Sequence, residues 1–215
     1  MGNTHQEHKW QRRKEDRPSE IIDAALELFV EHGFTATRLD EVAARAGVSK
    51  GTVYLYFENK EELFCSVVQE VILPEIQRFE VHVRDYQGSY EKLVRNMILE
   101  WWNVMGKSRM SGIPKLVIAE ASNFPDMAKY YVDNVVKRVR KIVEEVIRKG
   151  IKADEFKSCD VKSLTRVIMA PMVFAAIWER SLAPFDDEEY SIEKYIDSFL
   201  DTLFSGIKLR GVEKC

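Results

Sequence analysis

A short polar and basic segment in the first third of the chain has the residue types that bind phosphate. The segment Ser49 to Thr52 reads Ser-Lys-Gly-Thr and stands where a helix is expected to begin. The N–H groups in the first turn of a helix have no partner within it, and the helix dipole favours an anion there. Tyr54 and Tyr56 follow, with hydroxyls that can donate to phosphate. These small, polar and basic groups would allow close approach of the backbone to a nucleic acid.

Two short helices are expected to hold this segment in place. Thr37 and Asp40 have the spacing of a capping box, which predicts a helix start, and Gly47 ends that helix. Ser49 then caps a third helix over residues 50–57. Gly47 stands where the turn requires a positive φ, which glycine adopts without a Cβ clash. Two short helices joined in this way can place the second one in the major groove of DNA.

The flanking segments read as further helices of the same small domain. An amphipathic helix is expected to start at Pro18 and stop at Gly33, because apolar residues recur between them at spacings of three and four. Another helix starts at Asn59, with Glu62 in the position of a second capping box. Pro74 is expected to end or kink that helix.

The rest of the chain also has helical patterns. It has no sustained run of alternating β-branched residues, no internal repeat and no low-complexity linker. The fold class is therefore expected to be all-α, with an N-terminal three-helix helix-turn-helix domain in residues 1–64 and a larger C-terminal helical domain in residues 65–215. The helices expected beyond Pro74 cover residues 75–86, 89–106, 113–122, 125–150, 160–181 and 191–208.

The segment Ala25 to Leu63 resembles the DNA-binding signature of the TetR/AcrR family of regulators, nearly position by position. From Phe29 on it reads FxxxGFxxTxxxxVAxxAGVSKGTVYxYFxxKxxL, where x is any residue. The match lies within the first third of the chain, and it is specific because segments before and after the helix-turn-helix match as well. The rest of the chain resembles the family only in length, helix count and the EAxxFP segment from Glu120 to Pro125.

The resemblance implies a cytoplasmic homodimer whose two helix-turn-helix units read a palindromic operator in double-stranded DNA. Thr37 and Arg38 would approach the DNA backbone from the second helix, and Lys60 would hold a phosphate. Leu55 would touch a thymine methyl group or make no contact. The residues assigned to DNA in this way are Thr37, Arg38, Ser49, Lys50, Gly51, Thr52, Tyr54, Leu55, Tyr56 and Lys60.

The resemblance also implies ligand-gated repression. The free dimer would bind the operator, and a small apolar or amphipathic effector in residues 65–215 would favour a conformer that releases it. Activation, a response to a protein partner, and a broad architectural role in DNA binding are the alternatives.

Large, adaptable side chains in the C-terminal domain suit an effector pocket. Methionine adapts its shape and aromatic rings stack, although for any single one of these residues core packing is favoured over a place in a pocket. Glu120 lies on an otherwise apolar helix, where it would either recognise a cationic ligand or occupy an exposed face or ion pair. The candidate ligand-binding residues are Trp101, Met105, Met110, Glu120, Phe124, Tyr131, Met172 and Trp178.

Two apolar stripes near the C-terminus provide a candidate dimer interface as well as intramolecular core. Two such helices from each subunit can pack as a four-helix bundle, the arrangement that the family uses. The segment Val132 to Lys149 is a basic amphipathic helix, which is expected to be a core helix with a solvated face because Glu144 and Glu145 interrupt its charge run. The stripe residues are Val167, Ile168, Met172 and Ala175, followed by Ile192, Ile196, Phe199, Leu200 and Leu203.

The charge balance sets a condition on DNA binding. The chain has a formal net charge of −3, and residues 1–64 contain nine Lys and Arg against twelve Asp and Glu. The acidic side chains of this domain must therefore point away from DNA. The basic arm from Lys9 to Arg17 either adds phosphate or minor-groove contacts or is a solubilising tail.

Other classes of function lack the motifs that they require. The sequence has no nucleophile–base pattern, no phosphate-cradling glycine loop and no HExxH, so we expect neither an enzyme nor a cofactor. Cys65, Cys159 and Cys215 are widely spaced, which indicates neither a disulfide framework nor a metal site. The longest apolar run, from Val167 to Trp178, is too short to span a bilayer, and no membrane partner is expected.

Overall fold

The computed structural model describes residues 4–188 and 191–208, with residues 4–16 as backbone alone. Helices and their connections make up this part of the chain, where an isolated bridge between Phe156 and Lys208 is the one β pairing found. The expected all-α fold class is confirmed.

The chain divides into two compact units. We call Met1–Ile72 together with Leu116–Tyr131 the head unit, and Leu73–Lys115 together with Val132–Cys215 the body unit. The head unit thus contains more of the chain than the domain expected at residues 1–64, because a distant segment packs into it.

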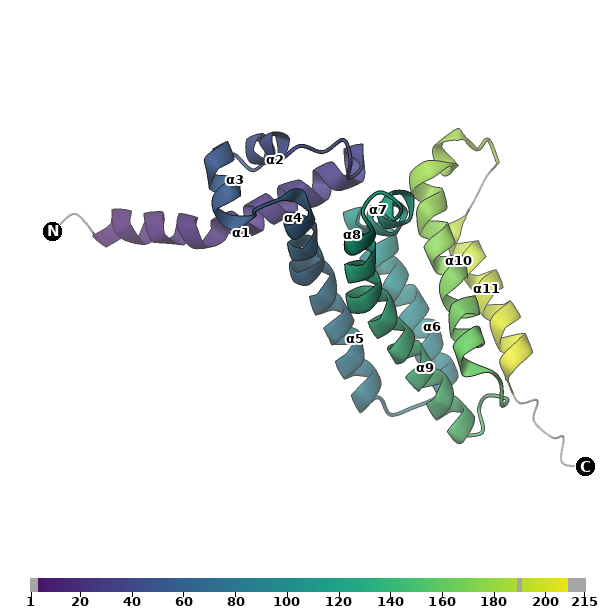
Figure 1. Cartoon of the computed structure of the whole chain (residues 1–215). Helices are drawn as coiled ribbons and strands as arrows, with labels where there is room; N and C mark the ends of the chain where they lie inside the picture. Colours follow the sequence, from purple (N-terminus) through teal and green to yellow (C-terminus); the bar gives the residue numbers. More distant parts are fainter. Residues whose placement is uncertain (1–3, 189–190, 209–215) are drawn as a thin grey trace, which may run out of the picture. The chain divides into compact units, whose positions relative to one another are not determined.

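The head unit is built on its long first helix. In Figure 1, α2 and α3 are short helices of this unit; α2 and α4 pack on α1, and α3 packs on α2. Helix α8 packs on α4. The elements of this unit are α1 (Thr4–His32), α2 (Leu39–Arg45), α3 (Lys50–Tyr56), α4 (Lys60–Val67), the π-helical turn η1 (Val68–Ile72), the end of α7 (Gly112–Glu120) and α8 (Pro125–Tyr131).

Local signals in the sequence account for the ends of these short helices. Gly33 ends α1 with a φ of +84°, and Gly47 turns the chain between α2 and α3 with a φ of +67°. The Ser49 hydroxyl accepts a hydrogen bond from the Thr52 N–H at 3.1 Å, which caps α3 as predicted. The Asn59 side chain caps α4 in the same way through the Glu62 N–H at 2.8 Å.

The body unit is a bundle of longer helices. Helix α9 packs against α5, α6 and α10, and α11 contacts both α6 and α10 (Figure 1). Its elements are α5 (Leu73–Asp85), α6 (Tyr90–Trp101), the π-helical turn η2 (Trp102–Gly106), the short turn η3 (Arg109–Ser111), the start of α7, the π-helical turn η4 (Val132–Val136), α9 (Lys137–Lys152), α10 (Val161–Ser181), the turn η5 (Ala183–Phe185) and α11 (Ile192–Ile207).

Three expected helix boundaries are corrected. Helix α1 begins at Thr4 rather than Pro18, because the residues before Pro18 are mostly strong helix formers and an internal proline removes a single helical hydrogen bond. At Pro74, where an end or a kink is expected, the helix does not end but continues through α5, and the π-helical turn over Val68–Ile72 precedes it. Helix α9 continues past Gly150, on which the Phe156 ring packs so closely that a Cβ there would lie 2.3 Å from it.

Two uninterrupted helical runs carry the chain from one unit to the other. Residues 60–85 comprise α4, η1 and α5, and residues 125–152 comprise α8, η4 and α9. The turn η1 is the last part of the first run in the head unit, and η4 is the first part of the second run in the body unit. Each run therefore has its π-helical turn where the chain changes unit.

Candidate nucleic-acid interface

The N-terminus of α3 leaves backbone and polar groups accessible to solvent. Ser49, Lys50 and Gly51 are exposed, and the Ser49 and Thr52 hydroxyls are 2.8 Å apart. A Cβ added at Gly51 would have a single neighbour within 4 Å, the Ser49 hydroxyl at 3.8 Å. The turn is therefore open enough for an anionic backbone to reach its free N–H groups.

The next turn of α3 divides its side chains between the core and solvent. Val53 is fully buried, whereas Tyr54 is 48% exposed and Leu55 is 73% exposed. Tyr56 is half-buried, with its ring centroid 6.4 Å from that of Phe57. An exposed leucine beside an exposed tyrosine is an unusual surface for a solvated helix and suits contact with base edges in a groove.

Ion pairs neutralise part of the acidic charge around this surface. The Lys50 ammonium lies 2.8 Å from an Asp40 carboxylate oxygen, and the hydrogen bond between them raises the pKa of Lys50. Arg45 lies 3.1 Å from Glu27 and 3.0 Å from Glu31. The acidic residues that would repel DNA are thus partly paired within the unit, and Arg38 at the start of α2 stays exposed.

Two residues that the sequence assigned to DNA have structural roles instead. The Thr37 side chain is 2% exposed, and its hydroxyl donates to the carbonyls of Leu28 and Gly33. The capping box expected at Thr37 and Asp40 does not form, because α2 begins one residue later and the Glu41 carboxylate accepts the Arg38 N–H. The Thr37 hydroxyl is therefore unavailable to a DNA backbone.

Lys60 is the second residue whose expected role is corrected. Its ammonium donates to the carbonyl oxygens of Phe34, Thr35 and Thr37 at 2.5, 3.1 and 3.1 Å, and lies 4.6 Å from the centre of the Phe34 ring. Partial burial lowers the pKa of Lys60, while the charges of Glu61 and Glu120 oppose that shift. All three donors of the ammonium are engaged, so Lys60 fixes the loop between α1 and α2 rather than a phosphate.

Glu120 and Phe124, which were candidates for the effector pocket, contact that same loop. The Glu120 carboxylate accepts the Thr35 N–H at 3.1 Å and the Thr35 hydroxyl at 2.9 Å. The Phe124 ring meets Phe34 edge to face, with centroids 4.7 Å apart. Sequence reasoning missed Thr35, although it lies inside the signature and its partner lies inside the EAxxFP segment.

The other effector candidates are divided between the two units. Met105 and Met172 are buried in the body unit, where Trp101, Met110 and Trp178 are half-buried. Tyr131 belongs to the head unit and is 8% exposed, and burial raises the pKa of its hydroxyl. The predicted effector set therefore does not belong to a single compact unit.

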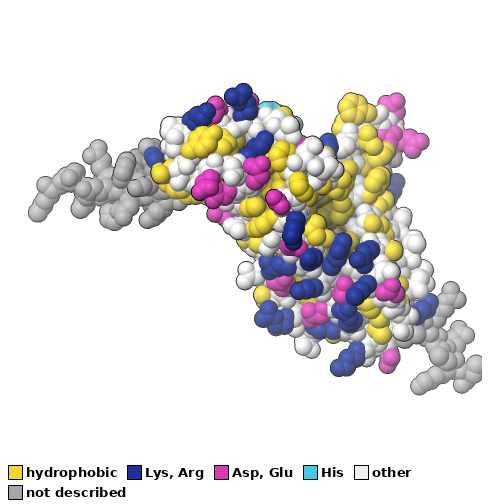
Figure 2. Space-filling model, viewed as in Figure 1, with side chains coloured by type: hydrophobic (Ala, Val, Ile, Leu, Met, Phe, Trp, Pro, Cys, Tyr) yellow, Lys and Arg dark blue, Asp and Glu magenta, His cyan; other side chains and the backbone are white. Residues whose placement is uncertain are grey.

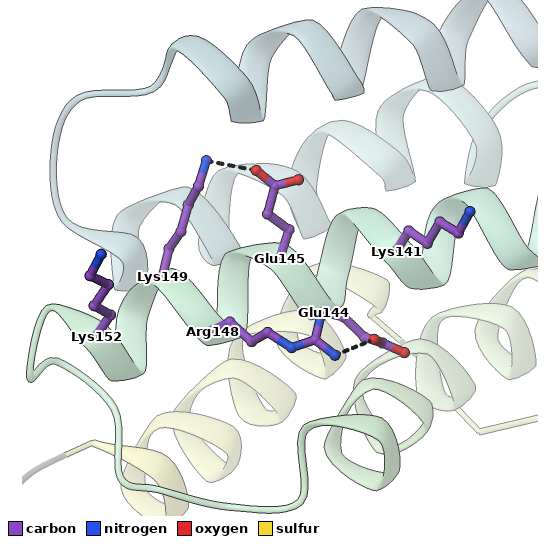
Figure 3. Close-up of a pocket in the computed structure, with 6 residues that line it drawn as sticks. All are labelled: Lys141, Glu144, Glu145, Arg148, Lys149 and Lys152. Atoms are coloured by element: carbon purple, nitrogen blue, oxygen red, sulfur yellow. Dashed lines mark hydrogen bonds and ion pairs between the residues drawn. The ribbon is translucent and has the colours of Figure 1, made fainter.

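A charged pocket on α9 contains none of these candidates. It has a volume of about 380 Å³, and its charged side chains project from a single helix (Figure 3). Arg148 pairs with Glu144 and Lys149 with Glu145, each at 2.7 Å. In Figure 2 the basic side chains of the body unit gather over α5 and α9. The charged side chains of α9 form the solvated face that the sequence predicted for the basic helix. The six residues that line the pocket are Lys141, Glu144, Glu145, Arg148, Lys149 and Lys152.

Two further observations concern metal sites and membrane-spanning helices, neither of which is expected from the sequence. Within residues 4–188 and 191–208, no group of three His, Cys, Asp or Glu side chains could hold a metal ion. Of the helices described there, α10 has the length and composition to cross a membrane, which is also common for a core helix of a soluble protein. It packs on α9 and α11 and has Pro171 in its interior.

Comparison with known families agrees with the interface on the head unit. Residues 21–67 match the model of bacterial regulatory proteins of the tetR family, and residues 94–204 match the AefR-like transcriptional repressor C-terminal domain. This chain belongs to the TetR family. As a member of that family, it is a DNA-binding transcriptional regulator of the repressor type.

Relatives of this TetR-family regulator extend over nearly its whole length. The fatty acid metabolism regulator protein of Bacillus subtilis (strain 168) is 29% identical over 198 residues, covering 90% of this chain and 98% of the relative. The solved structure of the Bacillus subtilis regulator FadR with stearoyl-CoA has a TM-score of 0.68 at 23% identity, covering 87% of this chain and 98% of that one. A TetR-family regulator from Pseudomonas syringae pv. tomato DC3000 has a TM-score of 0.69 at 22% identity, covering 91% and 98%.

Proposed function

We propose that this regulator is a cytoplasmic homodimer that reads a palindromic operator through α3 and releases it when a small apolar or amphipathic ligand binds the body unit. The observation that carries the proposal is the exposed N-terminus of α3, with its open glycine and its outward Tyr54 and Leu55. The surface that we propose for DNA omits Thr37 and Lys60. It consists of Arg38, Ser49, Lys50, Gly51, Thr52, Tyr54, Leu55 and Tyr56.

Selection of duplexes from a random-sequence pool tests DNA reading. The wild-type protein should enrich a palindromic sequence, because two copies of one surface would read two half-sites. Removing the exposed side chain in Tyr54→Ala should weaken binding of the selected duplex by roughly tenfold or more, as loss of a base or phosphate contact does. The variant Glu144→Ala, which alters a charged pair on α9 in the body unit, serves as the control.

Two results would contradict this proposal. If no sequence is enriched from the pool at low salt, the protein does not bind DNA sequence-specifically. An enriched duplex that Tyr54→Ala binds as tightly as the wild type would place the reading surface elsewhere.

The proposed effector site lies among the buried and half-buried methionines and tryptophans of the body unit. The relative FadR was solved with stearoyl-CoA, which supports a long acyl thioester as the first probe. Adding stearoyl-CoA to the complex of protein and selected duplex should release the DNA, with Glu144→Ala responding as the wild type does. Release by none of a panel of acyl-CoA chain lengths would contradict an acyl thioester as the effector.

The proposed dimer face is the outward side of α10. Val167 and Phe174 are 58% and 57% exposed, whereas Ile168, Met172 and Ala175 on the same helix are buried within the subunit. The stripe residues of α10 thus divide between the core and the exposed side, and exposed Val167 and Phe174 support the proposal that this side meets a second copy. An exposed apolar face of this kind is typical of homodimer interfaces.

Charge introduced into this face should separate the subunits. We expect Phe174→Asp to elute and scatter light as a monomer of 25.0 kDa at concentrations where the wild type is a dimer, because a desolvated carboxylate would oppose association. Phe185→Asp at a site that is 84% exposed on η5 provides a comparison of equal charge. A wild-type protein that scatters as a monomer at micromolar concentration would refute the dimer.

A further inference from the structure

The loop between α1 and α2 is held from two sides. On its inner side, the Lys60 ammonium binds the carbonyls of Phe34, Thr35 and Thr37. On its outer side, the Glu120 carboxylate binds both the N–H and the hydroxyl of Thr35. The side-chain amide of Asn123 donates to the same carboxylate at 3.1 Å and orients it. Together, these hydrogen bonds lower the pKa of Glu120, so the acceptor stays ionised at neutral pH.

An aromatic contact accompanies these hydrogen bonds. Phe34 is fully buried against Phe29 and Phe64 of the head unit, and Phe124 covers its remaining side. Phe124 follows Glu120 by four residues, and its N–H donates to the Glu120 carbonyl at 2.9 Å. The turn between α7 and α8 therefore presents a carboxylate and an aromatic ring to one loop, 85 residues away along the chain.

The loop determines where the DNA-reading helix lies. It leads directly into Arg38, where α2 starts, and α2 packs on α3. Asp40 of α2 also pairs with Lys50 of α3. A displacement of the loop would therefore move α2, and α3 would move with it.

We propose that Glu120 and Phe124 are positioning residues for DNA recognition, which hold α2 and α3 in the arrangement that fits the operator. This inference rests on the proposed reading surface of α3. The α7–α8 turn then affects the affinity for DNA although it does not contact DNA. Helix α7 starts in the body unit and ends at Glu120 in the head unit, so the turn also belongs to a helix shared by both units.

A double-mutant cycle between Glu120 and Thr35 tests the proposal. The variants Glu120→Ala, Thr35→Val and their combination are titrated with the duplex that the wild type selects. We expect Glu120→Ala to weaken binding by roughly tenfold, the size supported by hydrogen bonds to a charged acceptor. The double variant should be no weaker than Glu120→Ala, because both changes remove one interaction. Glu144→Ala removes a carboxylate that pairs with Arg148 on α9, away from the loop, and should leave the affinity unchanged.

Amide hydrogen exchange provides a readout that does not depend on DNA. In Glu120→Ala the Thr35 N–H should exchange faster, while the thermal midpoint of the body unit stays that of the wild type. Equal affinity of Glu120→Ala and wild type for the duplex, or a loss that tracks only global unfolding, would overturn the positioning role. If α3 is not the surface that reads DNA, Tyr54→Ala should bind the duplex as tightly as the wild type does. That result distinguishes failure of the proposed function from failure of the positioning role.

Discussion

Replacing Phe34 by alanine should unfold the head unit at a markedly lower temperature than any substitution on its surface. The ring is fully buried, and its centroid lies 5.2 Å from Phe29, 6.0 Å from Phe64 and 4.7 Å from Phe124. Loss of a buried phenylalanine costs about 3–5 kcal/mol, which is a large share of the stability of a small unit. In Phe34→Ala the ring over which the Lys60 ammonium lies is also absent.

Thermal unfolding followed by circular dichroism checks this prediction, with Phe185→Ala as the control. Phe185 has the same side chain but is 84% exposed, so its loss should change stability by about 0.5 kcal/mol at most. The head and body units are expected to melt separately in Phe34→Ala, because only one of them loses its core. Equal melting of the Phe34 and Phe185 variants would show that the aromatic cluster does not hold the head together.

The second large effect is expected from Lys60→Met, which keeps most of the side-chain volume and removes the charge. Three carbonyl oxygens would lose their donor, and such losses at partly buried groups sum to about 2 kcal/mol. The free energy of unfolding in urea should fall accordingly, and duplex affinity should also fall, because Lys60 holds the loop that leads into α2.

Salt dependence separates this structural role from a phosphate contact. A lysine that binds a phosphate displaces about one counterion from the DNA. Removing that lysine therefore makes the fall of log affinity with log salt shallower by about 1. We expect that change in slope from Lys50→Met, whose side chain is exposed, and not from Lys60→Met. A shallower slope and unchanged stability in Lys60→Met would restore the phosphate assignment.

Local signals made much of the fold predictable from the sequence. Ser49, Asn59, Gly33 and Gly47 act on their own turns, so the ends of the short helices follow from residues a few positions away. The helices of the body unit were predicted within a few residues because apolar periodicity is equally local. Pro18 does not mark the start of α1, because the helix formers before it continue the helix to Thr4.

The site was less predictable wherever a side chain finds its partner far along the chain. Tyr54 and Leu55 are exposed, as reading of DNA requires, since the spacing of α3 fixes which face is outward. Lys60 binds carbonyls 23 to 26 residues away, and Glu120 binds a residue 85 positions away. Neither partner can be inferred from charge or periodicity, since both depend on how the loop after α1 folds against other helices.

The π-helical turns η1 and η4 bear on how this chain tolerates changes in length. A π turn has one residue more than the α-helical turn that it replaces. Deleting one residue within residues 68–72 or 132–136 would therefore allow an ordinary α-helical turn, without breaking the continuous helix. In an α-helix each residue advances the chain by about 1.5 Å and rotates it by about 100°. The π turn thus absorbs its extra residue locally, so a deletion there would leave the faces of α5 and α9 unchanged, whereas a deletion elsewhere in these helices would rotate every following side chain by about 100°.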